Sequence, residues 1–373
     1  MYPQEREERP RKMRTPDQSQ DELFCTFSIE TLVPQDHPLR AIRQRADAAL
    51  KRMEPGIGKL YAATGRPGIP PERLLRALLL LVLYGYRSER RLMQEMRYNF
   101  ALRWFVGLTM SEEPWDVTVF TKNRQRFLDG DLAQEWLKAV VLEARQEKLL
   151  DEEHFSVDGT LIEAWASERS YQPKDNPPPP GQGSGRNGKL LKRDVFQSQT
   201  DADARLYRKS AGERFRLSYL GHLVTENQHG LIVASQASLA STRAEREVGT
   251  KLLKRVKQWL KVPGRRGPLT VGADKAYHEK DFVQAMRQLQ VQPHLGAYQA
   301  RRTDLIGEAV RQTEGYRESQ KKRKWIERCF AWIKGPAGQR KTRFRGLARV
   351  DWSFNFAAGV YNLLRMTTLL APA

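Results

Sequence analysis

The chain has 373 residues, of which 40% are hydrophobic, so it is long enough for a sizeable core and for two domains or one elaborated domain. A formal charge of +20 and a pI near 10 are too basic for an ordinary metabolic enzyme and favour a polyanionic partner such as nucleic acid; a solvated halo of Lys and Arg is the alternative. Only two cysteines, Cys25 and Cys329, are present, which excludes a disulfide scaffold and a cysteine-based zinc site.

The first part of the chain is predicted to be a polar arm followed by an all-helical domain. Residues 1–20 are almost wholly polar and charged and are interpreted as a disordered basic arm, with no apolar signal segment and no run long enough to span a membrane. Residues 21–150 are predicted to form the helical domain. Its helices are expected at 38–53, ended by Pro55-Gly56, and at 72–86, 88–96, 99–108, 116–127 and 132–147.

One of these helices carries several cations. Asp116 is expected to cap it, and Lys122, Arg124 and Arg126 follow within three turns. Such a helix could lie against a DNA backbone and read a DNA end, or it could be an ordinary solvated face.

From residue 151 the pattern changes to strands that alternate with helices. His154–Ala164 alternates like a strand, and Leu217–Leu239 is typical of two strands joined by the turn 226–230. Later elements are expected as strands at 268–274 and 291–297 and helices at 244–260, 280–289, 321–334 and 351–370. The order predicts an α+β fold over residues 151–373, a mixed sheet flanked by helices, with a flexible insertion near 170–215 and a disordered loop within 308–320.

Three carboxylates stand out in this second part. Asp158 lies in the first strand beside Gly159, Asp274 ends a later strand, and Glu327 lies on the helix that follows. Taken singly, they are more typical of a turn residue, a helix cap and an exposed member of an Arg/Lys ladder. Together they form a set that could hold two Mg²⁺ or Mn²⁺ ions for phosphoryl transfer, because these metals prefer oxygen ligands.

Basic residues surround the third carboxylate. On the predicted helix 321–334, Arg323, Glu327 and Lys334 fall on one polar stripe, opposite Trp325 and Trp332. Between residues 301 and 349 there are fifteen Lys or Arg and five Asp or Glu, about half of the excess charge of the chain. This excess predicts salt-sensitive binding to phosphates.

Three short motifs resemble the signature blocks of bacterial insertion-sequence DDE transposases, most closely the group around insertion sequences four and five. They are Val157-Asp-Gly-Thr160, Gly272-Ala-Asp-Lys-Ala-Tyr277, and Arg323 with Glu327 four and Lys334 eleven residues later. The segments 65–71 and 116–120 resemble the helical domain of that group. The resemblance covers nearly the whole chain from about Phe24.

The resemblance implies a ribonuclease H-like catalytic core with Asp158, Asp274 and Glu327 as ligands of two Mg²⁺ or Mn²⁺ ions. It also implies double-stranded DNA as partner, both transposon inverted repeats and target DNA, a homodimer when two ends are paired, and a bacterial cytoplasmic, nucleoid-associated location. The residues expected to contact DNA are Arg323, Lys334, Lys324, Arg340, Lys341, Arg343, Arg345, Lys122, Arg124 and Arg126. Many relatives carry tyrosine where this chain has Gln320, so a DNA contact by that tyrosine is not expected here.

Three functions follow from these observations. The first is a DNA transposase that cleaves at transposon ends and joins the 3′-hydroxyl to target DNA. The alternatives are a metal-dependent nuclease of the same fold and a DNA-binding protein that has lost catalysis. The intact set of Asp158, Asp274 and Glu327 speaks against the last of these.

Overall fold

The computed structural model describes residues 28–61, 68–175, 195–209, 212–260, 269–297 and 304–371. The arm predicted for residues 1–20 and most of the proline- and glycine-rich stretch 173–189 lie outside the described residues. Within the described part of the chain, no helix is long and apolar enough to cross a membrane.

The N-terminal part is helical, as predicted. Its helices are α1 (Ile29–Leu32), α2 (Pro38–Gly58), α3 (Pro71–Leu83), α4 (Glu89–Glu95), α5 (Phe100–Val106), α6 (Thr118–Asp129) and α7 (Leu132–Gln146). Ser88 and Asn99 cap α4 and α5, and the Asp116 carboxylate accepts the Thr118 N–H at 2.8 Å. The predicted end of α2 at Pro55 is wrong: the helix continues to Gly58, with Ile57 buried.

The second part contains a mixed sheet. The long strands β1 (His154–Glu163), β5 (Arg216–Glu226) and β6 (Ile232–Leu239) form antiparallel pairs, and β7 (Leu269–Ala273) and β8 (Val291–Leu295) run parallel to β1. β5 lies between β1 and both β6 and β4 (Arg205–Tyr207), and the sheet continues from β1 to β7 and β8. The prediction of a mixed sheet is therefore confirmed.

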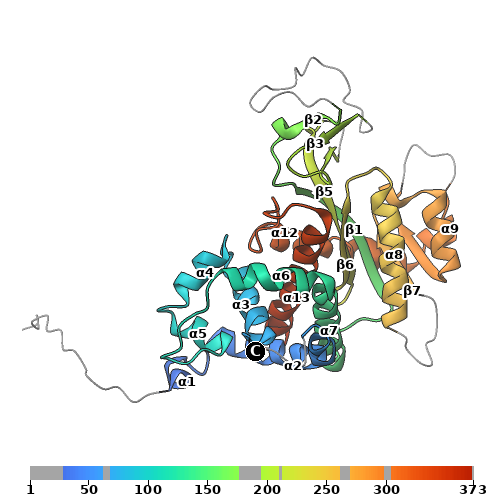
Figure 1. Ribbon diagram of the computed structural model, residues 1–373. Coiled ribbons are helices and arrows are strands. Elements are labelled where there is room, and N and C mark those ends of the chain that lie inside the picture. Colours follow the sequence, from blue (N-terminus) through green and yellow to red (C-terminus); the bar gives the residue numbers. More distant parts are fainter. Residues whose placement is uncertain are drawn as a thin grey trace, which may run out of the picture.

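The region expected to be a flexible insertion contains regular structure in its described residues. A 3₁₀ turn η1 (Glu168–Ser170) precedes β2 (Tyr171–Pro173), which pairs with β3 (Phe196–Ser198), and β4 extends the main sheet beside β5. Figure 1 shows the β2–β3 pair standing beyond one end of the main sheet.

Helices cover both faces of the sheet (Figure 1). On one face, Gly249 of α8 (Ala244–Trp259) approaches Val157, and α9 (Lys280–Gln288) packs on β8. Side chains of neighbouring residues in a strand point to opposite faces, so Ser156 faces the other way. There Ser156 and Gly272 meet α11 (Glu314–Lys322), and α12 (Trp325–Lys334) packs on β1 and β5.

Residues 308–320 are ordered helices and not the predicted disordered loop. They form α10 (Glu308–Arg311) and most of α11, whose start is capped by the Thr313 side chain. The predicted helix over 321–334 is also divided, because α11 ends at Lys322 and α12 begins at Trp325. At the break, the N–H groups of Ile326 and Glu327 bond three residues back, at 3.2 Å each.

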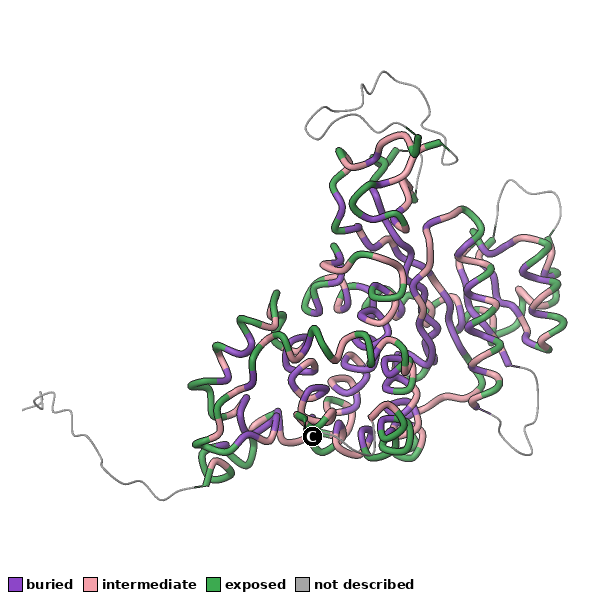
Figure 2. Tube along the Cα trace, viewed as in Figure 1, coloured by how far each residue is buried: buried purple, intermediate pink, exposed green. Residues whose placement is uncertain are grey.

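The last helix, α13 (Leu347–Leu369), joins the helical part to the sheet. Its residues Phe356 and Leu363 belong to the core of the N-terminal helices, whereas Phe354 and Ala358 belong to the core of the sheet. Figure 2 shows buried chain running from the N-terminal helices through α13 into the strands. The carboxylate of Asp351 also accepts the N–H of Ala237 on β6. Helix α13 thus contributes to both cores, as does α7 through Trp136 and Leu137.

A buried carboxylate organises the turn between β5 and β6. Glu226 is 1% exposed, and its two oxygens accept the N–H groups of Gln228, His229 and Leu231 at 2.8 Å each. Three backbone donors of the turn thereby share one buried acceptor.

We expect Glu226→Ala to lower the free energy of unfolding by about 2–4 kcal/mol, because it leaves these donors unsatisfied in the interior. Urea denaturation of the purified protein measures this. Glu318→Ala, at an exposed position on α11, is the matched control and should change the free energy of unfolding by less than about 0.5 kcal/mol. Equal stabilities of the two variants would contradict the role given to Glu226.

Candidate active site

Two of the three predicted ligands come from neighbouring parallel strands. The β1–β7 register pairs Phe155 with Val271 and Ser156 with Gly272. Continuing it by two residues sets Asp158 beside Asp274, which directly follows β7. Paired residues of parallel strands lie on the same face about 4.8 Å apart, so the fold brings these two carboxylates together.

The local structure holds both aspartates. Oδ1 of Asp274 accepts the Ala276 N–H at 2.8 Å and caps the 3₁₀ turn η2 (Lys275–Tyr277). Oδ1 of Asp158 accepts the Gly159 N–H at 2.7 Å. Asp274 is therefore a cap, as the pattern indicated, and this bond leaves its second carboxylate oxygen available.

Asp158 lies in an electrostatically unfavourable place. Burial raises the pKa of Asp158 to about 6, and the negative charges of Glu245 and Asp274 act in the same direction against the opposing charge of Lys209. Its side chain is 25% exposed, so it remains accessible to an ion. A buried carboxylate pair of this kind gains stability when a cation binds between them.

Glu327 is exposed on the first turn of α12. Its helix is fixed on the other side, where Cys329 is buried with its Sγ 3.4 Å from the Gly230 carbonyl oxygen, and the Trp332 ring packs against Tyr361 at an interplanar angle of 57°. In the described part of the chain, no three Asp, Glu, His or Cys side chains are grouped closely enough to hold a metal. The structure thus brings Asp158 and Asp274 together, whereas Glu327 is not grouped with them and lies on α12, which packs on β1.

Lys334 lies near Asp158, and Arg340 lies near Lys334. Burial lowers the pKa of Lys334, the positive charges of Lys209 and Arg340 lower it further, and the negative charges of Glu163 and Asp158 oppose them. The backbone of residues 340–342 runs alongside the end of β1. The Glu163 N–H donates to the Arg340 carbonyl oxygen at 3.0 Å, and Glu163 and Lys341 form an isolated parallel β-bridge through their backbones. Arg340 and Lys341 are exposed there.

Gln320, the residue that departs from the family pattern, positions Arg323. Its Nε2 donates to the His294 carbonyl at the end of β8 at 2.7 Å, and its Oε1 accepts from Arg323 Nε at 2.9 Å. Gln320 therefore connects the guanidinium of Arg323 to the end of β8.

Gly272 lets α11 approach the sheet. A Cβ at this position would lie 3.2 Å from the Ser319 carbonyl oxygen and 3.5 Å from Cβ of Arg323. A valine here overpacks the contact, and we expect Gly272→Val to lower the free energy of unfolding by about 2–3 kcal/mol.

Gly315→Ala, on the same helix, is the control for this prediction. The nearest atom to its added methyl would be 3.8 Å away, so a gain of up to about 1 kcal/mol is expected from helix propensity. Thermal denaturation compares the two variants. Similar small effects would show that α11 does not depend on Gly272.

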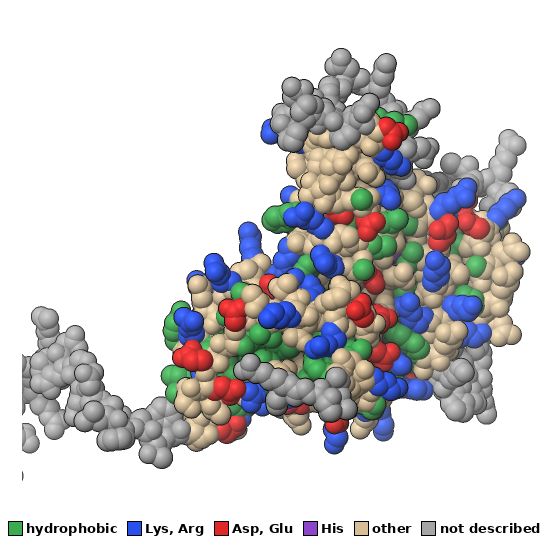
Figure 3. All heavy atoms as spheres, in the orientation of Figure 1, with side chains coloured by type: hydrophobic (Ala, Val, Ile, Leu, Met, Phe, Trp, Pro, Cys, Tyr) green, Lys and Arg blue, Asp and Glu red, His purple; other side chains and the backbone are tan. Residues whose placement is uncertain are grey.

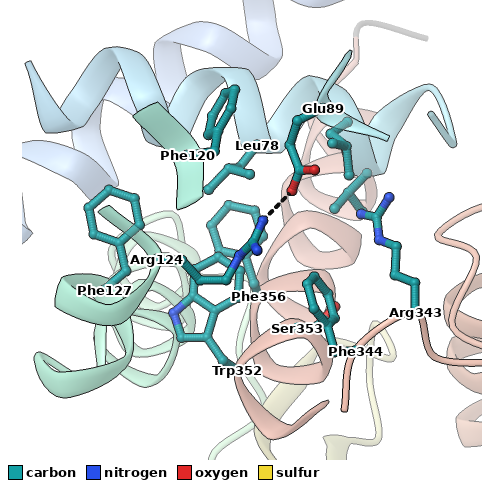
Figure 4. A pocket seen from close by; sticks show the side chains of 12 residues that line it. Leu78, Glu89, Phe120, Arg124, Phe127, Arg343, Phe344, Trp352, Ser353 and Phe356 are labelled. Atoms are coloured by element: carbon teal, nitrogen blue, oxygen red, sulfur yellow. Dashed lines mark hydrogen bonds and ion pairs between the residues drawn. The ribbon is translucent and has the colours of Figure 1, made fainter. Parts of the chain in front are cut away.

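Two of the arginines expected to contact DNA have partners inside the protein. Nη2 of Arg124 on α6 donates to the Glu89 carboxylate at 2.7 Å, and Nη1 of Arg343 donates to the Tyr86 carbonyl at 3.1 Å. Figure 4 shows both arginines and Phe344 around one pocket between the N-terminal helices and α13. Burial also lowers the pKa of Arg343. This geometry makes them contacts between the two parts of the chain.

The other predicted DNA contacts are exposed, except Arg323 and Lys334, which are partly buried. Arg126 stacks over the Tyr61 ring at 4.4 Å and donates to Asn123. Exposed side chains that complete the set are Lys122, Lys324 and Arg345. On the face shown in Figure 3, Lys and Arg side chains are spread from the helical part to the sheet, with Asp and Glu between them.

Two residues beside Asp158 were missed by sequence reasoning. Lys209 follows β4, in the segment interpreted as a flexible insertion, and Glu245 lies in the first turn of α8, which corresponds to the helix predicted at 244–260. Lys209 lies 3.9 Å from Asp158 and also pairs with Glu245, although each is at least fifty residues from Asp158 in the chain. No motif or spacing joins them, so only the fold could find them.

In chain order, the sheet has three antiparallel strands, β1, β5 and β6, and then two strands, β7 and β8, that run parallel to β1. With one carboxylate within β1 and another directly after β7, this arrangement defines a ribonuclease H-like core. The family comparison is more specific. A Transposase DDE domain matches residues 150–363, more than half of the chain, and a Transposase domain (DUF772) matches residues 27–126. The chain belongs to the DDE transposase family, and its function is that of a DNA transposase.

Solved transposase structures resemble the chain at low identity. A piggyBac transposase synaptic complex with hairpin DNA is 8% identical, with a TM-score of 0.38, and the match covers 91% of this chain and 77% of that one. The Mos1 mariner paired-end complex with Mn is 12% identical, with a TM-score of 0.21 and 85% of each chain covered. No curated protein sequence matches the chain significantly. The family assignment rests on the matched domains.

Proposed function

We propose that this transposase cleaves DNA at the ends of its element and joins the freed 3′-hydroxyl to target DNA, with Asp158, Asp274 and Glu327 as its catalytic carboxylates. The observation that carries the proposal is the β1–β7 register, which supports a shared site for Asp158 and Asp274. Glu327 on α12 is proposed to complete the set when metal and DNA are bound.

The donor chemistry of the three residues fits Mg²⁺ or Mn²⁺, which prefer carboxylate oxygens. Two such ions, when bound, activate the attacking water or 3′-hydroxyl and stabilise the leaving oxygen. The Mos1 complexes include one with Mn and one with Mg, which supports divalent metal use here. Asp158 and Asp274 are expected on one face of the sheet, and the burial and the negative charges that raise the pKa of Asp158 to about 6 also favour a bound cation there.

DNA lies, on this proposal, along the basic side of α12 and the segment that follows it. Lys334 is placed near Asp158, and Gln320 orients Arg323, so both can meet phosphates beside the cleaved bond. Lys324, Arg340, Lys341 and Arg345 extend this surface. Lys122 and Arg126 on α6 are proposed to contact the transposon end, and Arg124 and Arg343 hold α6 and the segment before α13 in place for it.

The assembly and origin complete the proposal. Pairing two transposon ends requires at least two active sites, so we propose a homodimer in the synaptic complex. The three motifs favour the bacterial group around insertion sequences four and five, and with it action on DNA in the cytoplasm and nucleoid.

The test uses the full chain, labelled inverted-repeat DNA, a target plasmid and Mg²⁺. Joined products support the proposed reaction, and cleavage without joining would instead favour a metal-dependent nuclease. Asp158→Ala and Glu327→Ala should bind DNA but neither cut nor join it. Binding by the parent without cleavage would overturn the proposal, and cleavage by either variant at the parental rate would remove that residue from the site.

A further inference from the structure

Lys209 makes three polar contacts beside the site. Its Nζ lies 3.9 Å from Oδ1 of Asp158 and 3.2 Å from Oε1 of Glu245, and it donates a hydrogen bond to the Gly159 carbonyl oxygen at 2.6 Å. The ammonium therefore lies between one proposed metal ligand and a carboxylate that has no role in the proposed reaction.

Glu245 is fixed above the strand that carries Asp158. A Cβ on Gly159 would come within 2.9 Å of Glu245 Cγ, so the absence of a side chain at Gly159 is what lets α8 place this carboxylate here. The Glu245 side chain is only 15% exposed, whereas that of Lys209 is 40% exposed. Glu245 is thus the fixed partner, and Lys209 is the partner with room to move.

The charges around Lys209 favour its ammonium form. Burial lowers the pKa of Lys209, but the charges of Asp158, Glu245 and Asp274 outweigh that effect and raise it overall. In turn, the Lys209 charge partly relieves the repulsion among these three carboxylates. A cation of the chain itself therefore does part of what a divalent ion would do for Asp158.

We propose that Lys209 is a positioning residue: an internal counter-ion of Asp158, anchored by Glu245, that a divalent metal displaces from Asp158 when it binds. This inference rests on the proposed function, because it takes Asp158 as a metal ligand. Lys209 holds Asp158 in its position before metal arrives and, by the same contact, competes with the metal.

The test is Mn²⁺ affinity, measured by isothermal titration calorimetry on the full-length protein without DNA. Lys209→Met should bind Mn²⁺ about five- to tenfold more tightly than the parent, because the competing charge about 4 Å from Asp158 is gone. Lys251→Met removes the same charge from an exposed position on α8, and it should change the affinity less than about twofold.

The role of Glu245 is tested by a double-mutant cycle. Glu245→Gln should weaken Mn²⁺ binding in the parent, because Lys209 loses its anchor and turns to Asp158, and should weaken it less in Lys209→Met. Unchanged or weaker Mn²⁺ binding by Lys209→Met would overturn the inference. Asp158→Asn separates the two proposals: if it binds Mn²⁺ like the parent, Asp158 is not a ligand and the proposed site fails as well.

Discussion

Asp158→Asn is expected to lose cleavage and joining by about 10³-fold or more while the protein becomes more stable above pH 6. The loss follows because removing one carboxylate from a metal site removes several kcal/mol of transition-state stabilisation. The gain follows because asparagine has no charge to bury, yet its side-chain oxygen can still accept the Gly159 N–H.

The sign of the pH effect comes from the raised pKa. The folded pKa of Asp158, about 6, lies above the ordinary value of 3.8 for an aspartate, so the folded protein binds the proton more tightly than the unfolded chain does. The contribution of protonated Asp158 to the free energy of unfolding is fully present below about pH 4 and is lost as the pH rises through 6. In the absence of metal, we expect Asp158→Asn to gain about 1–2 kcal/mol at pH 8 and nothing at pH 4.

Asp351→Asn is the matched control for this prediction. Burial raises the pKa of Asp351 to about 6 as well, and its partner is the Ala237 N–H on β6. Its stability should show the same pH trend, whereas its cleavage activity should stay near the parental level. Urea denaturation at pH 4, 6 and 8, combined with the cleavage assay, measures both. Parental activity in Asp158→Asn would remove Asp158 from the catalytic set.

The strands that carry the site were predictable because their signals are local. β1 alternates apolar and polar residues, and the β5–β6 turn is marked by Gly230, so residues 154–164 and 217–239 could be assigned from pattern alone. Asp158 and Asp274 then followed as residues of strands. Their proximity depends on the β1–β7 register, which the sequence pattern does not contain.

The errors in prediction come from tertiary contacts that override local preference. Pro55 removes one backbone hydrogen bond, yet α2 continues because Met53 and Ile57 are both buried in the core. Residues 308–320 are polar and suggested disorder, but Ser319 is 4% exposed and bonds to the His294 ring at 2.7 Å. Docking on the sheet stabilises α11, and hydrophobic periodicity does not report it.

The break between α11 and α12 had no sequence signal either. Neither Arg323 nor Lys324 is a glycine or proline, and both keep right-handed helical dihedral angles. The single stripe of Arg323, Glu327 and Lys334 predicted for a continuous helix is therefore interrupted after its first member. Glu327 and Lys334 remain on one helix, seven residues apart and hence on nearly the same face.

A large loss of stability is also expected from a substitution where α7 crosses α13. A Cβ on Gly359 would lie 2.3 Å from Nε1 of Trp136, whose side chain is fully buried and packs against Phe356. In an exposed helix Gly→Ala is stabilising by up to about 1 kcal/mol. Here we expect Gly359→Ala to lower the free energy of unfolding by about 2–3 kcal/mol, because the rigid indole ring must move within a packed core.

A double-mutant cycle tests whether the indole is the cause. Trp136→Phe removes the atoms that the new methyl would meet, so Gly359→Ala should cost about 1–2 kcal/mol less in that background. Equal costs in both backgrounds would place the strain elsewhere. Because α13 belongs to the cores of both the helices and the sheet, calorimetry should show one transition that shifts as a whole in Gly359→Ala. Two transitions, of which only one moves, would mean that α13 does not couple the helices to the catalytic sheet.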